Sequence, residues 1–183
     1  MKTILLDNKE IQIDEEDEER ILRFKWTAMP DGYFIAITDF VIIKLHRYLL
    51  RLQKSDFRCV DHKDLNKSNY QKLNLRPCSF SQNLQNQTKR VLPKATSKFK
   101  GVNWRKQRGF WITRITLFYK TVFIYSSGIE EECAYAYNIA ALFLFKSFAR
   151  LNDVIIQNEE TKIKIEESVM ERLKILKSYN TIS

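Results

Sequence analysis

The sequence predicts an α+β protein whose C-terminal half holds a three-stranded antiparallel sheet packed on one helix, followed by a final helix. Alternating β-branched and aromatic residues in FWITRITLFYKTVFIY, residues 110–125, predict two strands of a curled sheet. The segment FKGVNW, residues 99–104, predicts a shorter strand that precedes a turn at residues 107–109. Apolar residues at helical spacing then predict a helix that covers the apolar face of this sheet. They are Cys133, Tyr137, Ala140 or Ala141, Leu144 and Phe148.

Local signals support both helices. Ser127 followed by Glu130 predicts a capping box that opens the first one. The segment EETKIKIEESVMERLKILKS predicts a second, charged helix with one apolar stripe. The stripe consists of Ile165, Val169, Leu173 and Leu176. We expect it to pack on the rest of the protein, with docking on a partner as the alternative.

The composition is that of a folded protein with a polyanionic partner. The 183 residues are 44% hydrophobic and 29% charged, which is enough apolar content for a core and excludes a disordered tail or a collagen-like fibre. The formal net charge of +9 favours nucleic acid or an anionic membrane surface. Charge alone does not choose between the two.

The three cysteines, Cys59, Cys78 and Cys133, form no CxxC pair, so neither a disulfide framework nor a cysteine zinc cage is indicated. A reducing intracellular compartment fits this usage best. The first twenty residues turn acidic where a signal peptide needs an apolar run, and no apolar run approaches the length of a membrane span. We therefore expect a soluble protein.

One stretch concentrates the positive charge. Residues 90–120 contain nine bases and no acid. Aromatic residues interleave with or flank these bases: Phe99, Trp104, Phe110, Trp111, Phe118 and Tyr119. The alternative is a charged surface that faces solvent and binds nothing, but such a surface usually carries charges of both signs. We expect a polyanion to bind here.

Residues 58–83 carry the candidate chemistry. Asp61 and His62 stand side by side after an apolar valine, and many asparagines follow them. In one interpretation the asparagines and aspartates cap turns, and His62 is a polar loop residue. In the other, His62 is a base that activates water and Asp61 is a hard oxygen ligand for Mg²⁺, which together would cut a phosphodiester. The two share one site only if the strand ends or bends there.

These residues resemble the ββα-metal motif of HNH endonucleases of the phage and mobile-element homing type. The matching pieces are Asp61-His62, Asn74-Leu75-Arg76 and Ser81-Gln82-Asn83, and the resemblance extends over residues 10–86. It implies that His62 is the general base and that Asp61 and Asn83 hold one Mg²⁺, for which Mn²⁺ can substitute. It also implies that Asn74 braces the loop that orients His62. The chain departs from the pattern at Leu65, where the family often has glycine.

His46 and Arg47 precede this motif. A histidine that begins an apolar helix is more often a structural hydrogen bonder than a catalyst, and we expect this role for His46. Arg47 is a candidate for a phosphate contact. With only two histidines in the chain, a histidine-rich zinc site is excluded.

The basic strands and the helix after them resemble the APETALA-type, ERF-like DNA-binding domain over residues 97–152. The matching pieces are Lys100-Gly101-Val102, Trp111, the alanine-rich helix and Ala149-Arg150-Leu151-Asn152. The resemblance implies that the sheet enters the major groove of duplex DNA. By matching positions, Lys100, Asn103, Arg105 and Arg114 would face DNA, and Arg108 and Lys120 would reach phosphates. Trp111 fits a DNA contact and a core position about equally.

Together the two resemblances predict a nuclease domain at residues 1–90, with its motif at 58–86, and a DNA-binding domain at 97–152. VLPKATS, residues 91–97, would link them, and 153–183 would form a helical extension. The implied function is a monomeric, site-specific homing or mobile-element endonuclease that nicks duplex DNA in the cytoplasm of a phage-infected or bacterial cell. A non-catalytic, sequence-specific DNA-binding regulator is the alternative, and an RNA-binding protein is a weaker third.

Overall fold

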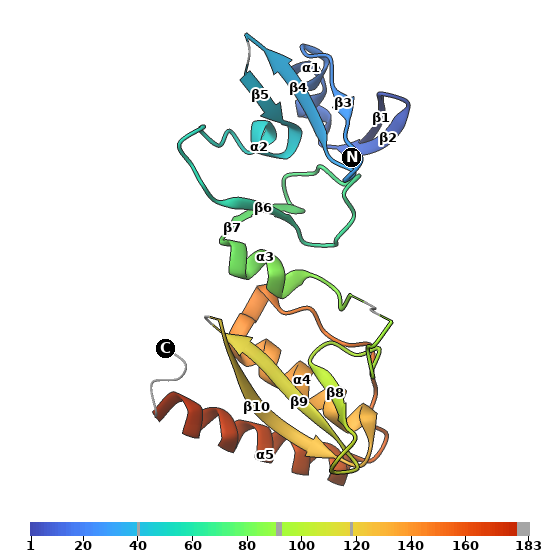
Figure 1. Ribbon diagram of the computed structural model, residues 1–183. Helices are drawn as coiled ribbons and strands as arrows, with labels where there is room; N and C mark the ends of the chain where they lie inside the picture. Colours follow the sequence, from blue (N-terminus) through green and yellow to red (C-terminus); the bar gives the residue numbers. More distant parts are fainter. Residues whose placement is uncertain (40, 91–92, 118, 179–183) are drawn as a thin grey trace. The chain divides into compact units, whose positions relative to one another are not determined.

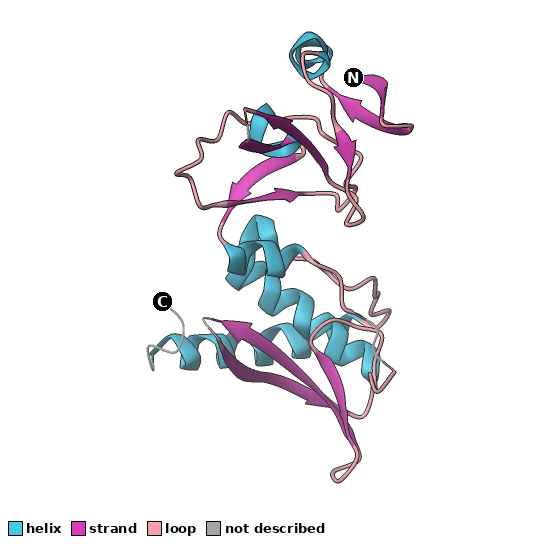
Figure 2. Ribbon diagram, turned by 45° about the horizontal axis from the view of Figure 1, so that its top comes forward, coloured by secondary structure: helices cyan, strands magenta, loops and turns pink. Residues whose placement is uncertain are grey.

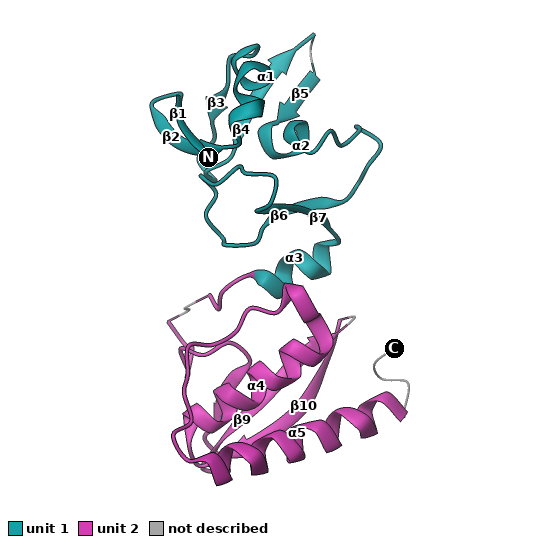
Figure 3. Ribbon diagram, turned by 180° about the vertical axis from the view of Figure 1, so that it is seen from behind, with its two compact units in different colours: residues 1–86 teal, residues 87–183 magenta. Residues whose placement is uncertain are grey.

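The computed structural model describes residues 1–39, 41–90, 93–117 and 119–178. The chain divides into two compact units, Met1–Asn86 and Gln87–Ser183 (Figure 3). Both combine helices with small antiparallel sheets, so the fold is of the mixed class that the sequence predicts (Figure 2). Phe118, Val91 and Leu92 lie outside the described residues, and so does part of the predicted linker. No described helix is both long and apolar enough to cross a membrane.

The first unit begins with a hairpin and a small sheet (Figure 1). The hairpin joins β1 (Lys2–Leu6) to β2 (Lys9–Ile13), and a 3-10 turn (Glu15–Asp17) and α1 (Glu18–Leu22) follow it. The sheet has the order β3 (Thr27–Ala28), β4 (Phe34–Thr38), β5 (Val41–Lys44), and α2 (Leu45–Leu49) follows β5 directly. Buried side chains of these elements, including Ile13, Ile21, Phe34 and Leu45, form one core.

The unit ends with a second hairpin and a helix. β6 (Cys59–His62) pairs with β7 (Leu75–Cys78), and α3 (Phe80–Asn86) follows. The long loop between the two strands is tied to the N-terminal hairpin, because Tyr70 donates its backbone N–H to the carbonyl of Gln12 at 2.8 Å. Cys59 and Cys78 are direct partners across this hairpin, which their separation in the sequence did not indicate. Both thiols are free.

The acidic residues near the N-terminus support this loop. Asp17 is buried, and its carboxylate binds Arg20 at 2.8 Å and Lys72 at 3.0 Å. Asp14 accepts the backbone N–H of Lys72 at 2.8 Å. The acidic run is therefore partly structural, since it holds the end of the 63–74 loop next to β7.

The second unit contains the predicted three-stranded meander. β8 (Val102–Arg105), β9 (Phe110–Leu117) and β10 (Lys120–Ser127) pair antiparallel in the order β10-β9-β8. α4 (Glu130–Phe145) covers one face, a 3-10 turn (Lys146–Phe148) follows it, and α5 (Glu159–Ser178) packs on α4 and β10. Gly101 has a φ of +76°, and a Cβ there would lie 2.1 Å from the ring of Tyr137 on α4. Only glycine fits this position, because both the backbone angle and the close approach of the helix exclude a side chain.

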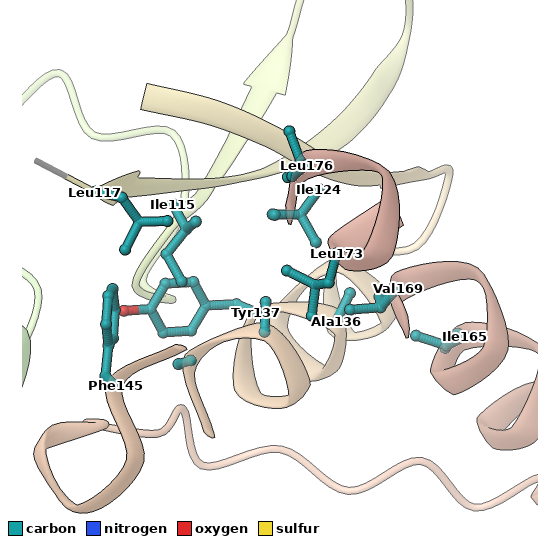
Figure 4. Close-up of a cluster of buried hydrophobic side chains, with 12 residues drawn as sticks. Ile115, Leu117, Ile124, Ala136, Tyr137, Phe145, Ile165, Val169, Leu173 and Leu176 are labelled. Carbon is teal, nitrogen blue, oxygen red and sulfur yellow. The ribbon is translucent and has the colours of Figure 1, made fainter. Parts of the chain in front are cut away.

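The C-terminal helix is part of this unit. All four residues of its predicted apolar stripe are buried, and they share a core with Ile115, Leu117, Ile124 and Tyr137 (Figure 4). The prediction that α5 packs on the protein is confirmed.

The predicted capping box is wrong. α4 has Ile129 at its N-cap position, and no side chain caps it. The Ser127 hydroxyl instead accepts the N–H of Ile129 at 3.0 Å and donates to the Glu132 carboxylate. Ser127 is still the last residue of β10, and its hydroxyl bonds the N–H of the N-cap residue itself. It therefore does not cap the first turn of the helix. Phe148 also lies beyond α4, which stops at Phe145, where Lys146 adopts a φ of +51°.

Candidate functional site

The Asp61–His62 pair lies at the end of β6, where the chain leaves the hairpin. Asp61 stands opposite Arg76 of β7, and His62 stands opposite Leu75. The strand stops at His62, whose carbonyl accepts the N–H of Leu65 in a tight turn at 3.0 Å. Both side chains are buried, with 3% of Asp61 and 4% of His62 exposed. The two side chains have different neighbours.

Asp61 is held from two sides. Its Oδ2 accepts from Nε of Arg76 at 2.8 Å and forms an ion pair with the second guanidinium nitrogen at 2.7 Å. The Nδ2 group of Asn86 lies 2.9 Å from Oδ1 and 3.0 Å from Oδ2. A buried carboxylate is stable only with such partners, because burial removes its hydration. Its position and charge are therefore fixed before any ligand binds.

Asn86 is the residue that sequence reasoning missed. It is buried at the end of α3, and its Nδ2 group also contacts the carbonyl of His62 at 3.0 Å, so one amide fixes both members of the pair. The available signal was its spacing, because residues three apart share a helix face and Asn83 is three residues earlier. Asn83 is half-buried, and its backbone N–H completes the first turn of α3 by donating to Ser79. The described contacts show no direct bond between Asn83 and Asp61.

Asn74 braces the loop that follows His62. Its amide donates to the Asp64 carboxylate at 2.9 Å and to the Asn69 carbonyl at 2.8 Å, and its oxygen accepts the Asp64 N–H at 3.1 Å. Burial acts to raise the pKa of Asp64, but hydrogen bonds from Asn69, Asn66 and Asn74 outweigh it and the pKa is lowered. The placement agrees with the expectation from the resemblance.

The interpretation in which asparagines and aspartates cap turns also describes part of this segment. Three side chains accept the backbone N–H two residues ahead: Asp64 from Asn66, Asn66 from Ser68 and Asn69 from Gln71. These are turn-forming contacts. Leu65 has a φ of +67°, so the position where the resemblance expects glycine has the backbone conformation that glycine favours. An ordinary side chain there costs about 1 kcal/mol.

The His62 ring is surrounded by other aromatic rings. Its ring centroid is 5.4 Å from that of Tyr70, 5.9 Å from Tyr33 and 6.2 Å from His46. Burial lowers the pKa of His62, so the imidazole is neutral at pH 7. Its Nε2 atom has no hydrogen-bond partner among the described residues. In a neutral imidazole one ring nitrogen donates and the other accepts, so Nε2 accepts a proton in the tautomer that carries its hydrogen on Nδ1.

His46 is the second histidine of this cluster. It is buried at the start of α2, 5.1 Å from the Tyr33 ring. Burial, followed by the charges of neighbouring His62, Lys44 and Arg47, lowers its pKa to about 3. Its Nδ1 atom is buried without a hydrogen-bond partner among the described residues, so the predicted hydrogen-bonding role is not seen and the placement favours packing. Arg47 is also engaged within the fold, because its guanidinium donates to the carbonyls of Gln53, Asp56 and Arg58.

Asp61 is itself a hard oxygen ligand, although the described groups that contact it are the N–H donors of Arg76 and Asn86. Carboxylate and amide oxygens are ligands that Mg²⁺ accepts. In the part of the chain that is described, no three His, Cys, Asp or Glu side chains gather into a metal site, but a set of one carboxylate and one amide would not form such a group. A carboxylate offers about four lone pairs. The described contacts use one at Oδ1.

The second unit offers a basic surface on the sheet face opposite α4. Residues on one face of a strand recur at every second position, and register pairs share a face. Asn103 pairs with Ile112 and Arg105 with Phe110, while Arg114 continues the same face of β9. Arg105, Arg114 and, in the adjoining turn, Arg108 border a hollow of about 800 Å³ that is also lined by Lys106 and Phe123, and Asn103 lies on the same face. We call this the sheet surface.

The other predicted contacts lie elsewhere. Lys100 is half-buried and donates its ammonium to the Gln87 carbonyl at 2.6 Å, and burial together with nearby Arg150 lowers its pKa to about 8. Trp111 and Thr113 lie on the same face of β9. Thr113 donates to the Cys133 carbonyl on α4, so this face is the one that α4 covers, and Trp111 packs against buried residues there. The core interpretation of Trp111 is therefore favoured. Lys120 is exposed at the far end of β10, opposite Leu117.

Arg172 of α5 is a further base beside the sheet surface. Its Nε donates to the Phe123 carbonyl at 3.2 Å, and its guanidinium carbon lies 5.9 Å from the centre of that ring. Phe123 is the register partner of Arg114. The sequence did not indicate this contact, because the pairing of α5 with β10 depends on the tertiary fold.

No family model matches this chain, and no curated protein matches it. The two sites are therefore interpreted from their own geometry: a buried, rigid polar cluster in the first unit, and an exposed basic face in the second.

Proposed function

We propose that the protein is a DNA endonuclease that hydrolyses phosphodiester bonds with one divalent metal and a histidine general base. The observation that carries this proposal is the neutral, unpaired imidazole of His62 at the end of β6, next in sequence to a carboxylate that Arg76 and Asn86 hold in place. A base must be deprotonated to accept a proton, and the lowered pKa of His62 keeps it so at neutral pH.

In the proposed reaction, His62 takes a proton from a water molecule, whose oxygen attacks the phosphorus. The bond to the 3′ oxygen breaks, and that oxygen takes a proton from solvent, which leaves a 5′-phosphate and a 3′-hydroxyl. Asp61 and Asn83 would hold the cation, and Asn74 would keep the loop after His62 in place. When bound, Mg²⁺ supplies positive charge that stabilises the phosphorane and the leaving oxygen.

The sheet surface supports duplex DNA as the substrate. Arginine can donate two hydrogen bonds to guanine and asparagine can pair with adenine, so Arg105, Arg114 and Asn103 on one face are suited to read base edges. Arg108 lies in the turn beside them, where it can reach a phosphate. We propose that the chain acts as a monomer and nicks one strand, because its described residues form one such site. A role in homing or in a mobile element extends this proposal, and target mapping would test it.

A non-catalytic, sequence-specific DNA-binding regulator is the second candidate. The observation that favours it is the engagement of both Asp61 oxygens by Arg76 and Asn86, an arrangement that also serves a purely structural ion pair. In that case the first unit would be a scaffold and the sheet surface would be the only functional site.

A nicking assay tests the proposal. It measures the conversion of supercoiled plasmid, and of genomic DNA from the source organism, to nicked products. Wild type, His62→Ala and His62→Gln are compared in Mg²⁺, Mn²⁺ and EDTA, with duplex binding measured for all three. We expect metal-dependent nicking by wild type and a loss of about 10²-fold or more in both variants at nearly unchanged binding. Equal cleavage by the variants contradicts the role of His62. Tight duplex binding without cleavage in either metal favours the regulator, and preferential competition by single-stranded RNA contradicts the DNA assignment.

A further inference from the structure

A groove on the first unit lies outside the Asp61–His62 cluster. It has a volume of about 870 Å³ and is lined by residues of β5, α2 and the loop that joins α2 to β6. Figure 1 labels these elements. Its charged lining consists of Arg20, Lys44, Arg47, Arg51, Lys54 and Asp56. Five of these six groups are bases. The exposed side chains of Val41 and Ile42 add an apolar floor.

The bases divide into structural and free ones. Arg47 is engaged by backbone carbonyls, and Arg20 pairs with Asp17. The side chains of Lys44, Arg51 and Lys54 are exposed, and no ion pair or hydrogen bond ties them to a described residue. The single acid is neutralised, because Asp56 forms an ion pair with Arg58 at 2.7 Å. The free charge of the groove is therefore positive.

Phe57 stands at this groove with 94% of its surface exposed. A fully exposed phenylalanine gains nothing from folding. The loop that carries it is nevertheless rigid, because Arg47 donates to the carbonyl of Gln53 at 3.0 Å, to that of Arg58 at 2.7 Å and to that of Asp56 between them. Three such bonds fix the backbone on both sides of Phe57. The backbone position from which the exposed ring projects is thus fixed.

We propose that this groove is a second binding site for duplex DNA, in which Lys44, Arg51 and Lys54 contact phosphates and Phe57 inserts between two base pairs. The inference rests on the proposed function and adds a contact on the cutting unit itself. An apolar wedge beside free bases is the combination by which proteins unstack and bend a duplex. Unstacking costs a few kcal/mol per step, and a wedge on a backbone that is already fixed has only its side chain left to order.

Two properties of DNA binding test the groove separately. Insertion unwinds the duplex, so a plasmid relaxed by a metal-independent topoisomerase in the presence of the full-length protein changes its linking number. EDTA keeps the proposed cleavage off during this measurement. Phosphate contacts appear in the salt dependence of duplex binding, whose slope changes by about 0.9 for each contact.

We expect wild type to unwind the plasmid and Phe57→Ala to lose more than half of the unwinding per bound protein while its salt slope stays constant. Leu5→Ala, which shortens an exposed side chain on β1, is the matched control and should unwind like wild type. The double variant Lys44→Gln, Lys54→Gln should reduce the slope by about 1.8. Lys9→Gln with Lys25→Gln removes two exposed charges elsewhere on the unit and should leave the slope unchanged.

The outcomes separate the two proposals. Wild-type values for Phe57→Ala and for the lysine double variant overturn the groove, whether or not the protein cuts, and this is also the result if the groove serves a protein partner. Unwinding that depends on Phe57 in a protein that never nicks keeps the groove and contradicts the catalytic proposal. Failure of wild type to bind duplex DNA overturns both.

Discussion

The polar residues of the two units are used in opposite ways. In the first unit, the buried Asp61 is bonded to the half-buried Arg76 and the buried Asn86. In the second unit, Arg105 is exposed and Arg114 borders an open hollow. Buried charges interact strongly and have fixed geometry, whereas exposed charges are screened and mobile. The first arrangement suits chemistry at one atom, and the second suits attraction to an extended polyanion.

The largest effect is expected from breaking the buried cluster at α3. Asn86→Ala removes the amide that contacts Asp61 and the His62 carbonyl, and it leaves a buried carboxylate partly unsatisfied. We expect a loss of about 1–3 kcal/mol in the free energy of unfolding, measured in urea, together with loss of cleavage.

Asn83→Ala is the matched variant, because it removes an amide one turn earlier on the same helix. We expect it to lose cleavage while its stability stays close to wild type, since its side chain makes no described hydrogen bond. If both variants were equally stable, the structural role of Asn86 would be contradicted.

A second prediction compares bases within the second unit. Arg105→Gln with Arg114→Gln should reduce the slope of log affinity for duplex DNA against log salt by about 1.8. Lys100→Gln should change it by clearly less than 0.9, because its ammonium is already bound to the Gln87 carbonyl. Fluorescence anisotropy over a salt series measures both slopes. A full contribution from Lys100 would show that its ammonium leaves Gln87 to contact DNA.

A third prediction uses the buried histidines. The pKa of His46 falls from an unfolded value near 6.5 to about 3 in the folded protein. Below pH 6.5 His46 therefore binds a proton in the unfolded chain but not in the folded one. The contribution of the neutral histidine to the free energy of unfolding is fully present above this pH. It is lost as the pH falls toward 3, by up to about 1.4 kcal/mol per pH unit for each such histidine.

Urea unfolding between pH 7 and pH 5 tests this dependence before most carboxylates protonate. His46→Gln should flatten the dependence by roughly half, because His62, whose pKa is also lowered, remains. An unchanged slope would mean that His46 is accessible to protons in the folded state.

The smallest effect is expected at α5. Arg172→Gln should reduce the salt slope of duplex binding by about 0.9 if its guanidinium, placed at Phe123, reaches a phosphate. Lys174→Gln is the control with the same loss of charge, and it lies about 200° around the helix. Equal slopes for the two variants would restrict DNA contact to the sheet itself.

Much of the second unit could be predicted from its sequence. Strand alternation at residues 110–125 and the apolar stripe of α5 both report burial on one side of a regular element, and both predictions are confirmed. The capping box failed because two residues at the right spacing do not form a cap when the first is still in a strand. For Trp111, the sequence left the choice of face open, and the register of β9 favours the core.

In the first unit, the sequence by itself determined which residues carry the candidate chemistry. Asp61, His62 and Asn74 lie in one hairpin and its loop, and local spacing is enough to bring them together. Only the tertiary structure decided which partners complete the cluster. Asn86 meets Asp61 and Arg172 meets Phe123, each through the packing of elements distant in sequence. Sequence periodicity reports which face of an element is buried, and it carries no information about which other element covers that face.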